Sequence, residues 1–393
     1  MLKSVRIMLA IDAFYDYEIW QMDVKTAFLN GFLEEELYMM QPEGFIDPKD
    51  ANKVCKLQRS IYGLVQASRS WNKHFDSVIK AYGFIQTFGE ACIYKKVSGS
   101  SVAFLILYVD DILLIGNDIE FLDSIKGYLN KSFSMKDLGE DAYILGIKIY
   151  RDRSRCLIGF SQSTYLDKVL KKFKMDQAKK GFLPVLQGVK LSQTQCPTTA
   201  EDREKMEDVP YAIGSIMYAM LCTRPDVCLA ISLAGRYQSN PGVDHWTAVK
   251  NIPKYLKRTK DLFLVYGGDK ELVINGYVDA SFDTDPDDSK SQTGYVFLLN
   301  GGAVSWCSSK QSVVVGSTCE AEYIATSEAA NEGVRMKEFI SNLGVIPSAS
   351  GLMEIFCDNT GAIALAKESR FHKRTKHIKR RFSSIRHQVS EGA

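Results

Sequence analysis

The chain has 393 residues, of which 46% are hydrophobic and 24% are charged. This composition is that of an ordinary globular protein of two or three domains, and it excludes a collagen-like, coiled-coil or extensively disordered chain. The 49 basic and 47 acidic side chains give a net charge of +2, which by itself favours neither nucleic acid nor a membrane as a partner.

Signals for a membrane or for secretion are weak. The most hydrophobic stretch, residues 102–116, is interrupted by Asp110 and Asp111, so we expect no transmembrane helix. Residues 1–12 lack the apolar core and cleavage site of a signal peptide. The nine cysteines form no CxxC pair, which favours reduced thiols over disulfides or a zinc site. We therefore expect a soluble, intracellular protein.

Residues 4 to about 178 mix amphipathic segments of helical length with short apolar runs, which predicts an α+β or α/β domain. Early in this part, Asp23 ends an apolar-leaning segment and precedes a segment of helical character, so we expect it at the end of a strand. Residues 101–116 read as two strands joined by a tight turn that contains Asp110 and Asp111.

The adjacent carboxylates of that turn allow two interpretations. Like charges at the tip of an apolar hairpin are tolerated poorly unless a cation neutralises them, which favours a metal site. An ordinary acidic turn, with one aspartate bonded to the backbone and one solvated, is the alternative. If Asp23 meets the pair, the three carboxylates have the donors to hold two Mg²⁺ ions for phosphoryl transfer. Spacing alone leaves both interpretations open.

Further along, apolar residues at helical spacing predict a helix over 163–175, with Ser163 or Thr164 as its N-cap. The polar segment 179–208 carries two prolines and no sustained period, so we interpret it as a linker or long loop. Residues 211–261 contain two apolar stripes at helical spacing and predict a small helical subdomain.

The last part predicts a separate α/β domain of about 120 residues. Strand-like runs at 272–278, 294–299 and 303–306 precede a long helix and a strand at 353–357. Residues 271–366 hold 4 basic and 13 acidic side chains, whereas residues 367–393 hold 9 basic and 2 acidic ones. The basic run is typical of a solvated face or tail, and it also suits binding to a phosphate backbone.

An ordered series of motifs resembles the reverse transcriptase of copia-type long-terminal-repeat retrotransposons, followed by ribonuclease H. The first part of the series is Gln21-Met-Asp-Val-Lys-Thr-Ala-Phe-Leu-Asn-Gly31, Ser60-Ile-Tyr-Gly-Leu-Val-Gln-Ala-Ser-Arg-Ser-Trp71, Tyr108-Val-Asp-Asp111 and Met135-Lys-Asp-Leu-Gly139. The second part is Tyr277-Val-Asp-Ala280, Cys319-Glu-Ala-Glu-Tyr-Ile-Ala325, Cys357-Asp-Asn359 and Arg374-Thr-Lys-His-Ile378. The resemblance covers nearly the whole chain.

The resemblance implies fingers and palm over 1–178, a linker and helical thumb or connection over 179–270, and a ribonuclease H-like domain with a basic segment over 271–393. It implies that Asp23, Asp110 and Asp111 bind two Mg²⁺ ions, with Mn²⁺ as a substitute. The implied substrates are deoxynucleoside triphosphates, an RNA template with a DNA primer, and an RNA–DNA hybrid, handled in a cytoplasmic particle or the nucleus. Three substrate contacts are implied as well, those of Phe28 (nucleotide sugar), Gln66 (nucleotide or template) and Lys136 (proton donor to pyrophosphate).

For the ribonuclease H-like domain, the metal-binding acids implied are Asp279, Glu322 and Asp358. Glu320 is the competitor of Glu322, but Ser317-Thr-Cys-Glu320 has the form of a capping box, which favours a structural role for Glu320. The acidic residues at 283, 285, 287 and 288 lie beside Pro286 and predict a hydrated acidic loop.

Two departures from the family pattern favour an impaired protein. The fourth acid of the ribonuclease H pattern is replaced by Lys379, which removes a ligand and adds a repelling charge. The basic fingers strands that precede Ser4 in the family are missing, so we expect an N-terminally truncated polymerase. The alternative function is therefore an inactive transposon remnant that binds nucleic acid. An unrelated metal-dependent phosphotransferase would require the ordered motifs to be accidental.

Overall fold

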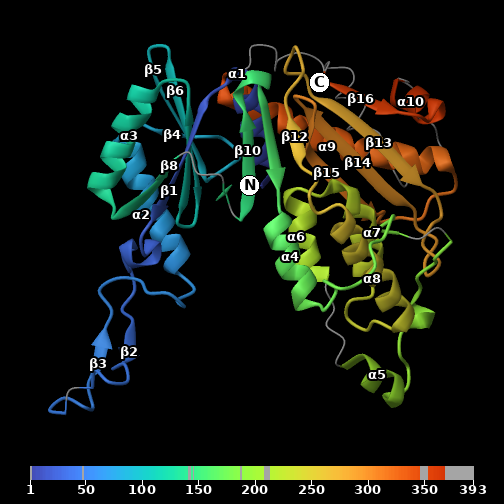
Figure 1. The fold of residues 1–393 in the computed structure, drawn as a ribbon, viewed down its shortest axis with the longest axis horizontal. Coiled ribbons are helices and arrows are strands. Elements are labelled where there is room, and N and C mark those ends of the chain that lie inside the picture. Colours follow the sequence, from blue (N-terminus) through green and yellow to red (C-terminus); the bar gives the residue numbers. More distant parts are fainter. Residues whose placement is uncertain are drawn as a thin grey trace. The chain divides into compact units, whose positions relative to one another are not determined.

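The computed structural model describes residues 2–46, 48–139, 143–144, 146–185, 188–207, 213–345 and 353–367, in the mixed α and β class that the sequence predicts (Figure 1). Two compact units divide the chain. Residues 17–144 form what we call the inserted unit, and residues 1–16 together with 145–393 form the split unit. Residues 2–15, which precede the inserted unit in sequence, form a helix that packs within the split unit.

The inserted unit is built on a six-stranded sheet in the order β4-β5-β6-β7-β1-β8. Alternate residues of the central strands β1, β6 and β7 pack against helices α2 and α3, and the core includes the fully buried Trp71 and Phe75. The elements are β1 (Glu18–Val24), η1 (Ala27–Asn30), β2 (Tyr38–Met40), β3 (Val54–Lys56), α2 (Ala67–Ala81), β4 (Ile85–Gln86), β5 (Ile93–Ser98), β6 (Ser101–Tyr108), β7 (Asp111–Gly116), α3 (Ile119–Ser132), β8 (Met135–Gly139) and β9 (Tyr143–Ile144).

The predicted hairpin over 101–116 is confirmed, with its turn shifted by one residue. Strands β6 and β7 pair in antiparallel fashion, and Tyr108 lies opposite Asp111. The two central turn residues are therefore Val109 and Asp110, while Asp111 begins the second strand. The prediction that Asp23 lies near a strand end is also confirmed, because β1 ends at Val24 and is followed by the 3-10 helix η1.

The split unit begins with α1 (Leu2–Tyr15) and continues with β10 (Ile147–Asp152), η2 (Arg153–Arg155) and β11 (Leu157–Ser161). Its helical part contains α4 (Ser163–Lys172), η3 (Gln193–Gln195), α5 (Ala200–Glu207), α6 (Ile213–Cys222), η4 (Pro225–Val227), α7 (Cys228–Gly235) and α8 (Val243–Arg258). Helices α4, α6, α7 and α8 share one apolar core, which confirms the helical prediction for 211–261. None of the helices in the described ranges is long and apolar enough to cross a membrane.

The N-cap prediction for α4 is wrong. Gln162 occupies the N-cap position and makes no side-chain capping bond. Its side chain is buried and instead accepts a hydrogen bond from the Thr223 hydroxyl at 2.7 Å. Ser163 is already helical, and its N–H donates to the Ser161 hydroxyl at 3.3 Å. The segment 179–208, predicted as a linker, contains the short helices η3 and α5 among loops.

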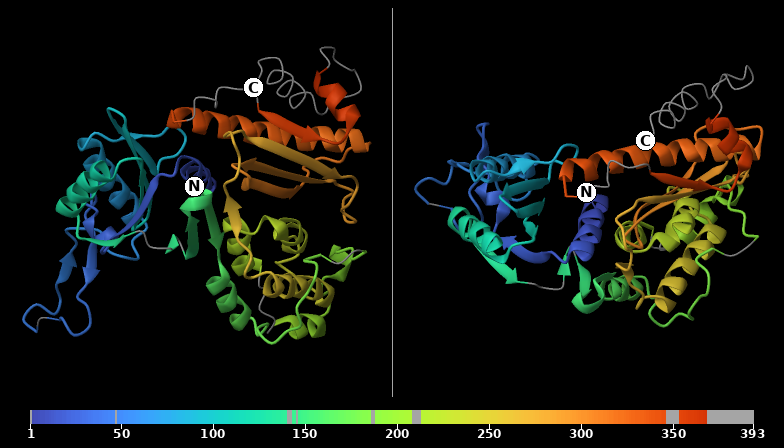
Figure 2. Two further views of the ribbon diagram at one scale, coloured as in Figure 1. Left: turned by 45° about the horizontal axis from the view of Figure 1, so that its top comes forward. Right: turned by 90° about the horizontal axis from the view of Figure 1, so that it is seen from above.

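A four-stranded sheet in the order β15-β14-β13-β16 forms the rest of the split unit. Strand β12 (Leu264–Tyr266) belongs to another sheet, in which it pairs with β11 in antiparallel fashion. The strands of the β15-β14-β13-β16 sheet are β13 (Asn275–Ser281), β14 (Gln292–Leu299), β15 (Gly302–Lys310) and β16 (Glu354–Cys357). The long helix α9 (Thr318–Leu343) runs across one face of this sheet, and α10 (Thr360–Lys367) follows β16 (Figure 2). The first strand of this domain begins at residue 275 rather than at the predicted 272, so Asp279 lies inside it.

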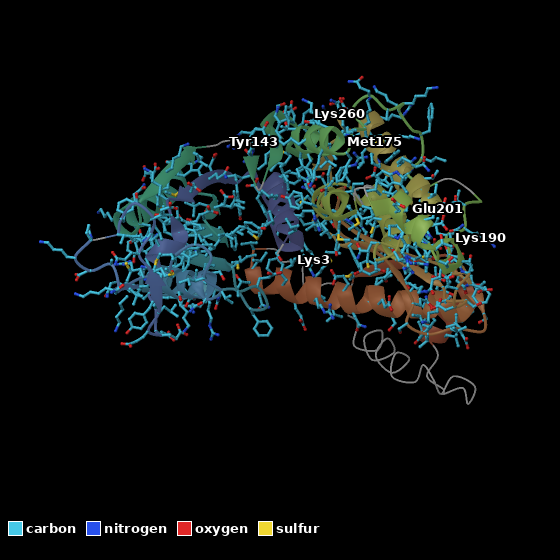
Figure 3. All side chains as sticks on the ribbon, turned by 90° about the horizontal axis from the view of Figure 1, so that it is seen from below. Lys3, Tyr143, Met175, Lys190, Glu201 and Lys260 are labelled. Atoms are coloured by element: carbon cyan, nitrogen blue, oxygen red, sulfur yellow. The ribbon has the colours of Figure 1, made fainter. Side chains whose placement is uncertain are left out.

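Helix α1 is fastened to this sheet by Arg6, which is buried. Its Nε donates to the Val304 carbonyl at 2.8 Å, and its Nη1 donates to the Leu221 carbonyl at 2.5 Å and the Cys222 carbonyl at 3.3 Å. The guanidinium also lies 4.0 Å from the centre of the Trp306 ring. On the same helix, Lys3 donates to Glu332 of α9 at 3.0 Å, and Figure 3 shows its side chain beside that helix.

The hydrated acidic loop predicted at 283–288 is wrong in one respect. The carboxylate of Asp285 is 1% exposed and forms ion pairs with Arg236 Nη1 at 2.5 Å and Lys310 Nζ at 2.7 Å. Asp287 accepts hydrogen bonds from the Gln193 N–H and from the Tyr237 hydroxyl. The loop is therefore anchored by charge pairs to the end of α7 and to β15, and the neighbouring sequence cannot reveal these contacts.

Candidate functional site

Strand β1 and the β6–β7 hairpin bring the first three candidate acids together. Strands β1 and β7 pair in antiparallel fashion with Asp23 directly opposite Asp111. The Asp110 carbonyl accepts a hydrogen bond from the Val24 N–H at 2.9 Å, which attaches the turn to the end of β1. We call Asp23, Asp110 and Asp111 the hairpin acids.

The hairpin acids repel one another in a partly dry environment. Burial raises the pKa of Asp111, a hydrogen bond from Gln21 opposes this shift, and the negative charges of Asp110 and Asp23 add to it. A divalent cation would relieve this repulsion, and carboxylate oxygens are the donors that Mg²⁺ prefers. The donor set therefore fits a hard divalent cation.

The turn that carries Asp110 has a constrained backbone. Val109 has a φ of +58°, a conformation rarely adopted by a β-branched residue. Its carbonyl accepts a hydrogen bond of 2.6 Å from Trp71 Nε1, which helps to hold the turn in this form. Residues with unusual backbone conformations concentrate at functional sites, where the surrounding structure enforces them.

We expect Val109→Gly to raise the free energy of unfolding by about 0.5–1 kcal/mol. Glycine adopts this φ without strain, and this gain exceeds the opposing effect of its greater freedom in the unfolded chain. Urea unfolding measures this effect. Val97→Gly, at an exposed position on β5, is the control and should be destabilising. A destabilised Val109→Gly would contradict strain at this turn.

The three predicted substrate-contacting residues lie on three different elements of the inserted unit. Phe28 lies on η1, packs against the core of the inserted unit, and has its ring 4.9 Å from that of Tyr62. Gln66 is half-buried at the N-cap of α2. Lys136 is exposed on β8 directly opposite Asp23. Of these three residues, Lys136 is the one that pairs with a hairpin acid in the strand register.

A close contact between η1 and α2 fixes the position of Phe28. A Cβ atom on Gly31 would lie 2.7 Å from Ser60 Oγ and 2.9 Å from the backbone nitrogen of Trp71. The Ser60 hydroxyl donates to the Phe28 carbonyl. Because Trp71 also binds the Val109 carbonyl, the packing of α2 links the segment that carries Phe28 to the hairpin turn.

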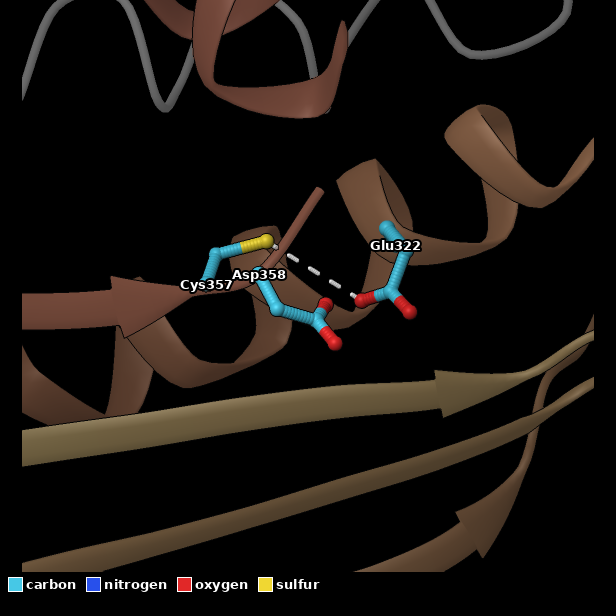
Figure 4. Close-up of side chains that lie close together, drawn as sticks. All are labelled: Glu322, Cys357 and Asp358. Atoms are coloured by element: carbon cyan, nitrogen blue, oxygen red, sulfur yellow. Dashed lines mark hydrogen bonds between the residues drawn. The ribbon is translucent and has the colours of Figure 1, made fainter. Parts of the chain in front are cut away.

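A second group of acids lies in the split unit, where β13, β16 and α9 meet. Ligand atoms of Glu322, Cys357 and Asp358 all lie within 4.8 Å of one another (Figure 4). Within the described residues, this is the group compact enough to hold a metal ion as it stands, whereas the hairpin acids are not gathered that closely. Asp279 lies on the neighbouring strand, one residue beyond the paired Val278 and Cys357, and is exposed.

The two glutamates of α9 occupy different environments. Glu322 is buried, and its Oε1 accepts a hydrogen bond from the Ala280 N–H at 3.1 Å. Burial raises the pKa of Glu322, this hydrogen bond opposes the shift, and the charges of Asp279 and Asp358 add to it. Glu320 instead accepts a hydrogen bond from the Gly316 N–H at 2.9 Å, while its own N–H donates to the N-cap residue Ser317. The Glu320 carboxylate thus caps the N–H of Gly316 instead of the predicted N–H of the N-cap residue Ser317.

Sequence reasoning did not assign a role to two residues at these sites. Gln21 contacts Asp111 across strands, and Cys357 has its sulfur 4.0 Å from Glu322 Oε2. Gln21 lies two residues before Asp23, and Cys357 directly precedes Asp358. This proximity to candidate acids is the sequence signal that could have identified both residues. Lys379 and the basic segment that follows residue 367 lie outside the described residues.

Known proteins resemble the chain over most of its length. A family model for reverse transcriptase (RNA-dependent DNA polymerase) matches residues 1–187. The retrovirus-related Pol polyprotein of the tobacco (Nicotiana tabacum) transposon TNT 1-94 is 45% identical over 99% of this chain, and that of the Arabidopsis thaliana transposon RE2 is 35% identical over 99%. The chain spans 29% and 26% of these two polyproteins. A Saccharomyces cerevisiae transposon Ty5-1 protein is 32% identical over 79% of this chain and 100% of its own length.

Proposed function

Because the chain belongs to the reverse transcriptase family of copia-type transposon Pol polyproteins, we propose that it extends a DNA primer on an RNA or DNA template, with deoxynucleoside triphosphates as substrates. The observation that carries the proposal is the pairing of Asp23 with Asp111 beside the hairpin turn of Asp110. In this proposal the inserted unit contains the palm and part of the fingers.

The chemistry follows from the charges. Mg²⁺ ions, when bound by Asp23, Asp110 and Asp111, would lower the pKa of the primer 3′-hydroxyl and neutralise the triphosphate. The chain supplies the anionic ligands from two paired strands, and the constrained turn limits their movement. Such preorganisation lets binding energy act on the transition state instead of on ordering the site.

The neighbouring residues receive substrate roles in the same proposal. Phe28, fixed by the close contact at Gly31, would place a bulky ring against the nucleotide sugar and exclude a 2′-hydroxyl. Gln66 would contact the nucleotide or the template. Lys136, exposed and opposite Asp23, would donate a proton to the departing pyrophosphate, since it is the basic residue of β8.

Primer extension on a homopolymer RNA template tests this function. The purified chain should lengthen a labelled oligo-dT primer on poly(rA) in the presence of dTTP and Mg²⁺ or Mn²⁺, and chelation by EDTA should stop the reaction. A chain that binds primer–template but adds no nucleotide with either cation would overturn the polymerase proposal. That result would support the alternative, a nucleic-acid-binding remnant, which the basic run over 367–393 favours.

For the split unit we propose a ribonuclease H-like site at Asp279, Glu322 and Asp358. Divalent cations held there would activate a water molecule against an RNA phosphodiester. The close approach of Glu322 and Asp358 supports this proposal, and the hydrogen bond from the Ala280 N–H fixes the Glu322 carboxylate. The capping contact of Glu320 supports Glu322 as the ligand, because it engages the Glu320 carboxylate elsewhere.

We expect cleavage of an RNA–DNA hybrid to be slow in the natural chain because Lys379 stands where the family pattern has an acid. Lys379→Asp should raise the cleavage rate at least about tenfold, since it removes a repelling charge and adds a ligand. Lys379→Ala should give a smaller gain, and adding Glu322→Gln to Lys379→Asp should abolish it. Gel analysis of a 5′-labelled RNA strand measures all of these rates. A rate unaffected by Lys379→Asp would contradict the predicted impairment.

A further inference from the structure

Gln21 is a buried amide beside three carboxylates. It lies on β1 two residues before Asp23, and because side chains alternate along a strand, Gln21 and Asp23 share one face of the sheet. The residue is 8% exposed, although glutamine is mostly exposed in folded proteins. A polar side chain in this position requires partners, so its contacts indicate its role.

The contact of Gln21 with Asp111 crosses from β1 to β7. Its Nε2 donates to Asp111 Oδ1 at 3.1 Å. Within the described residues, Gln21 is the only side chain that donates a hydrogen bond to this carboxylate. Asp111 lies opposite Asp23 in the strand register. Gln21 is the next residue on the same face of β1, so its amide reaches Asp111 diagonally across the two strands.

The chemical type of the donor matters. A lysine or arginine at this position would neutralise Asp111 and compete with a cation, while an acid would add to the repulsion among the hairpin acids. A neutral amide donates a hydrogen bond without changing the net charge of the cluster. The hydrogen bond also restricts rotation of the Asp111 carboxylate.

We infer that Gln21 is a positioning residue that orients Asp111 for cation binding. The inference rests on the proposed function of the hairpin acids. Residues that hydrogen-bond to a metal ligand fix its orientation, and replacing them typically lowers metal affinity or activity by about 10- to 100-fold. Gln21 fits this role because it touches Asp111 and occupies none of the ligand positions assigned to Asp23, Asp110 and Asp111.

Gln21→Met tests the inference because methionine keeps the length and burial of the side chain but has no N–H donor. Mn²⁺ binding to the purified full chain is measured by electron paramagnetic resonance without nucleic acid, with Glu322→Gln present throughout to weaken the second group of acids. We expect Mn²⁺ affinity to fall about 10- to 100-fold. In extension assays kcat should fall and the Mg²⁺ requirement should rise, while KM for primer–template stays unchanged.

Gln86→Met is the matched control. Gln86 lies on β4 at the edge of the same sheet, and its Nε2 donates to the Ala91 carbonyl at 2.8 Å. This variant loses a comparable hydrogen bond and should keep wild-type Mn²⁺ affinity and kcat. Gln21→Leu, which also lacks an N–H donor, is the second variant and should weaken Mn²⁺ binding to a similar extent. It keeps the test decisive if Gln21→Met does not fold.

A double-mutant cycle separates positioning from a general effect on folding. If Gln21 acts through Asp111, then Gln21→Met should change Mn²⁺ affinity little once Asp111→Asn is present. Additive losses, or Mn²⁺ affinity within twofold of wild type for Gln21→Met, would overturn the positioning role alone. A wild-type chain that neither binds Mn²⁺ at the hairpin acids nor extends a primer would overturn the proposed function and the inference with it.

Discussion

Primer extension should fall at least about a thousandfold when Asp110 is replaced by asparagine. The substitution keeps the size of the side chain but removes one anionic ligand at the constrained turn between β6 and β7. Metal ions contribute several kcal/mol of transition-state stabilisation, and about 4 kcal/mol corresponds to three orders of magnitude in rate. Single-nucleotide addition under saturating dTTP measures this loss directly.

The stability of the Asp110→Asn variant, unlike its activity, should not fall. Removing one of three like charges relieves repulsion with Asp111, so the thermal midpoint in EDTA should be equal to or above that of the wild type. Asp123→Asn is the control, because Asp123 is exposed on α3 in the same unit. It should keep wild-type extension. Extension by Asp110→Asn within tenfold of wild type would remove Asp110 from the proposed catalytic machinery.

Arg6→Met should lower the free energy of unfolding of the split unit by about 3–5 kcal/mol. The carbonyls of Val304, Leu221 and Cys222 would each lose a buried charged donor. A buried acceptor without a partner costs about 1–3 kcal/mol, and the lost contact with the Trp306 ring adds to this. The burial that makes the contact strong also lowers the pKa of Arg6.

Urea unfolding followed by tryptophan fluorescence measures this effect, since Trp306 itself contacts Arg6. Arg6→Lys should be nearly as destabilising, because an ammonium group cannot reproduce the planar set of donors that reaches three carbonyls. Lys3→Met is the control on the same helix, where the pair with Glu332 is partly exposed, and it should cost less than about 1 kcal/mol. Equal midpoints for Arg6→Met and Lys3→Met would contradict the fastening role of Arg6.

The parts of the structure that the sequence predicted are those with strong local patterns. The hairpin over 101–116 follows from apolar runs around an acidic turn, and the helices of 211–261 follow from their stripes. The ordered motif series contains the candidate acids Asp23, Asp110 and Asp111, but spacing alone could not show that these acids meet in the fold. Their meeting depends on the pairing of β1 with β7, a contact between segments about 90 residues apart.

The features that were missed depend on distant partners. Asp285 reads as a loop acid because its neighbours are acidic, but the residues that bury it, Arg236 and Lys310, come from α7's end and from β15. Helix α1 reads as part of the first domain because it adjoins β1 in sequence, yet Arg6 bonds to a residue 298 positions later. Local propensity carries no information about either contact, since both arise from tertiary packing.

The packing of α1 also sets an order for folding during synthesis. At about 5–20 residues per second, β15 is completed roughly 15–60 s after α1. Until then the apolar helix lacks the strand that covers it, although the inserted unit, which follows it directly, already has all of its own strands. We therefore expect nascent chains released before residue 304 to depend on chaperones. A contact made by one of the first residues of the split unit thus has to wait until most of the chain has been synthesised.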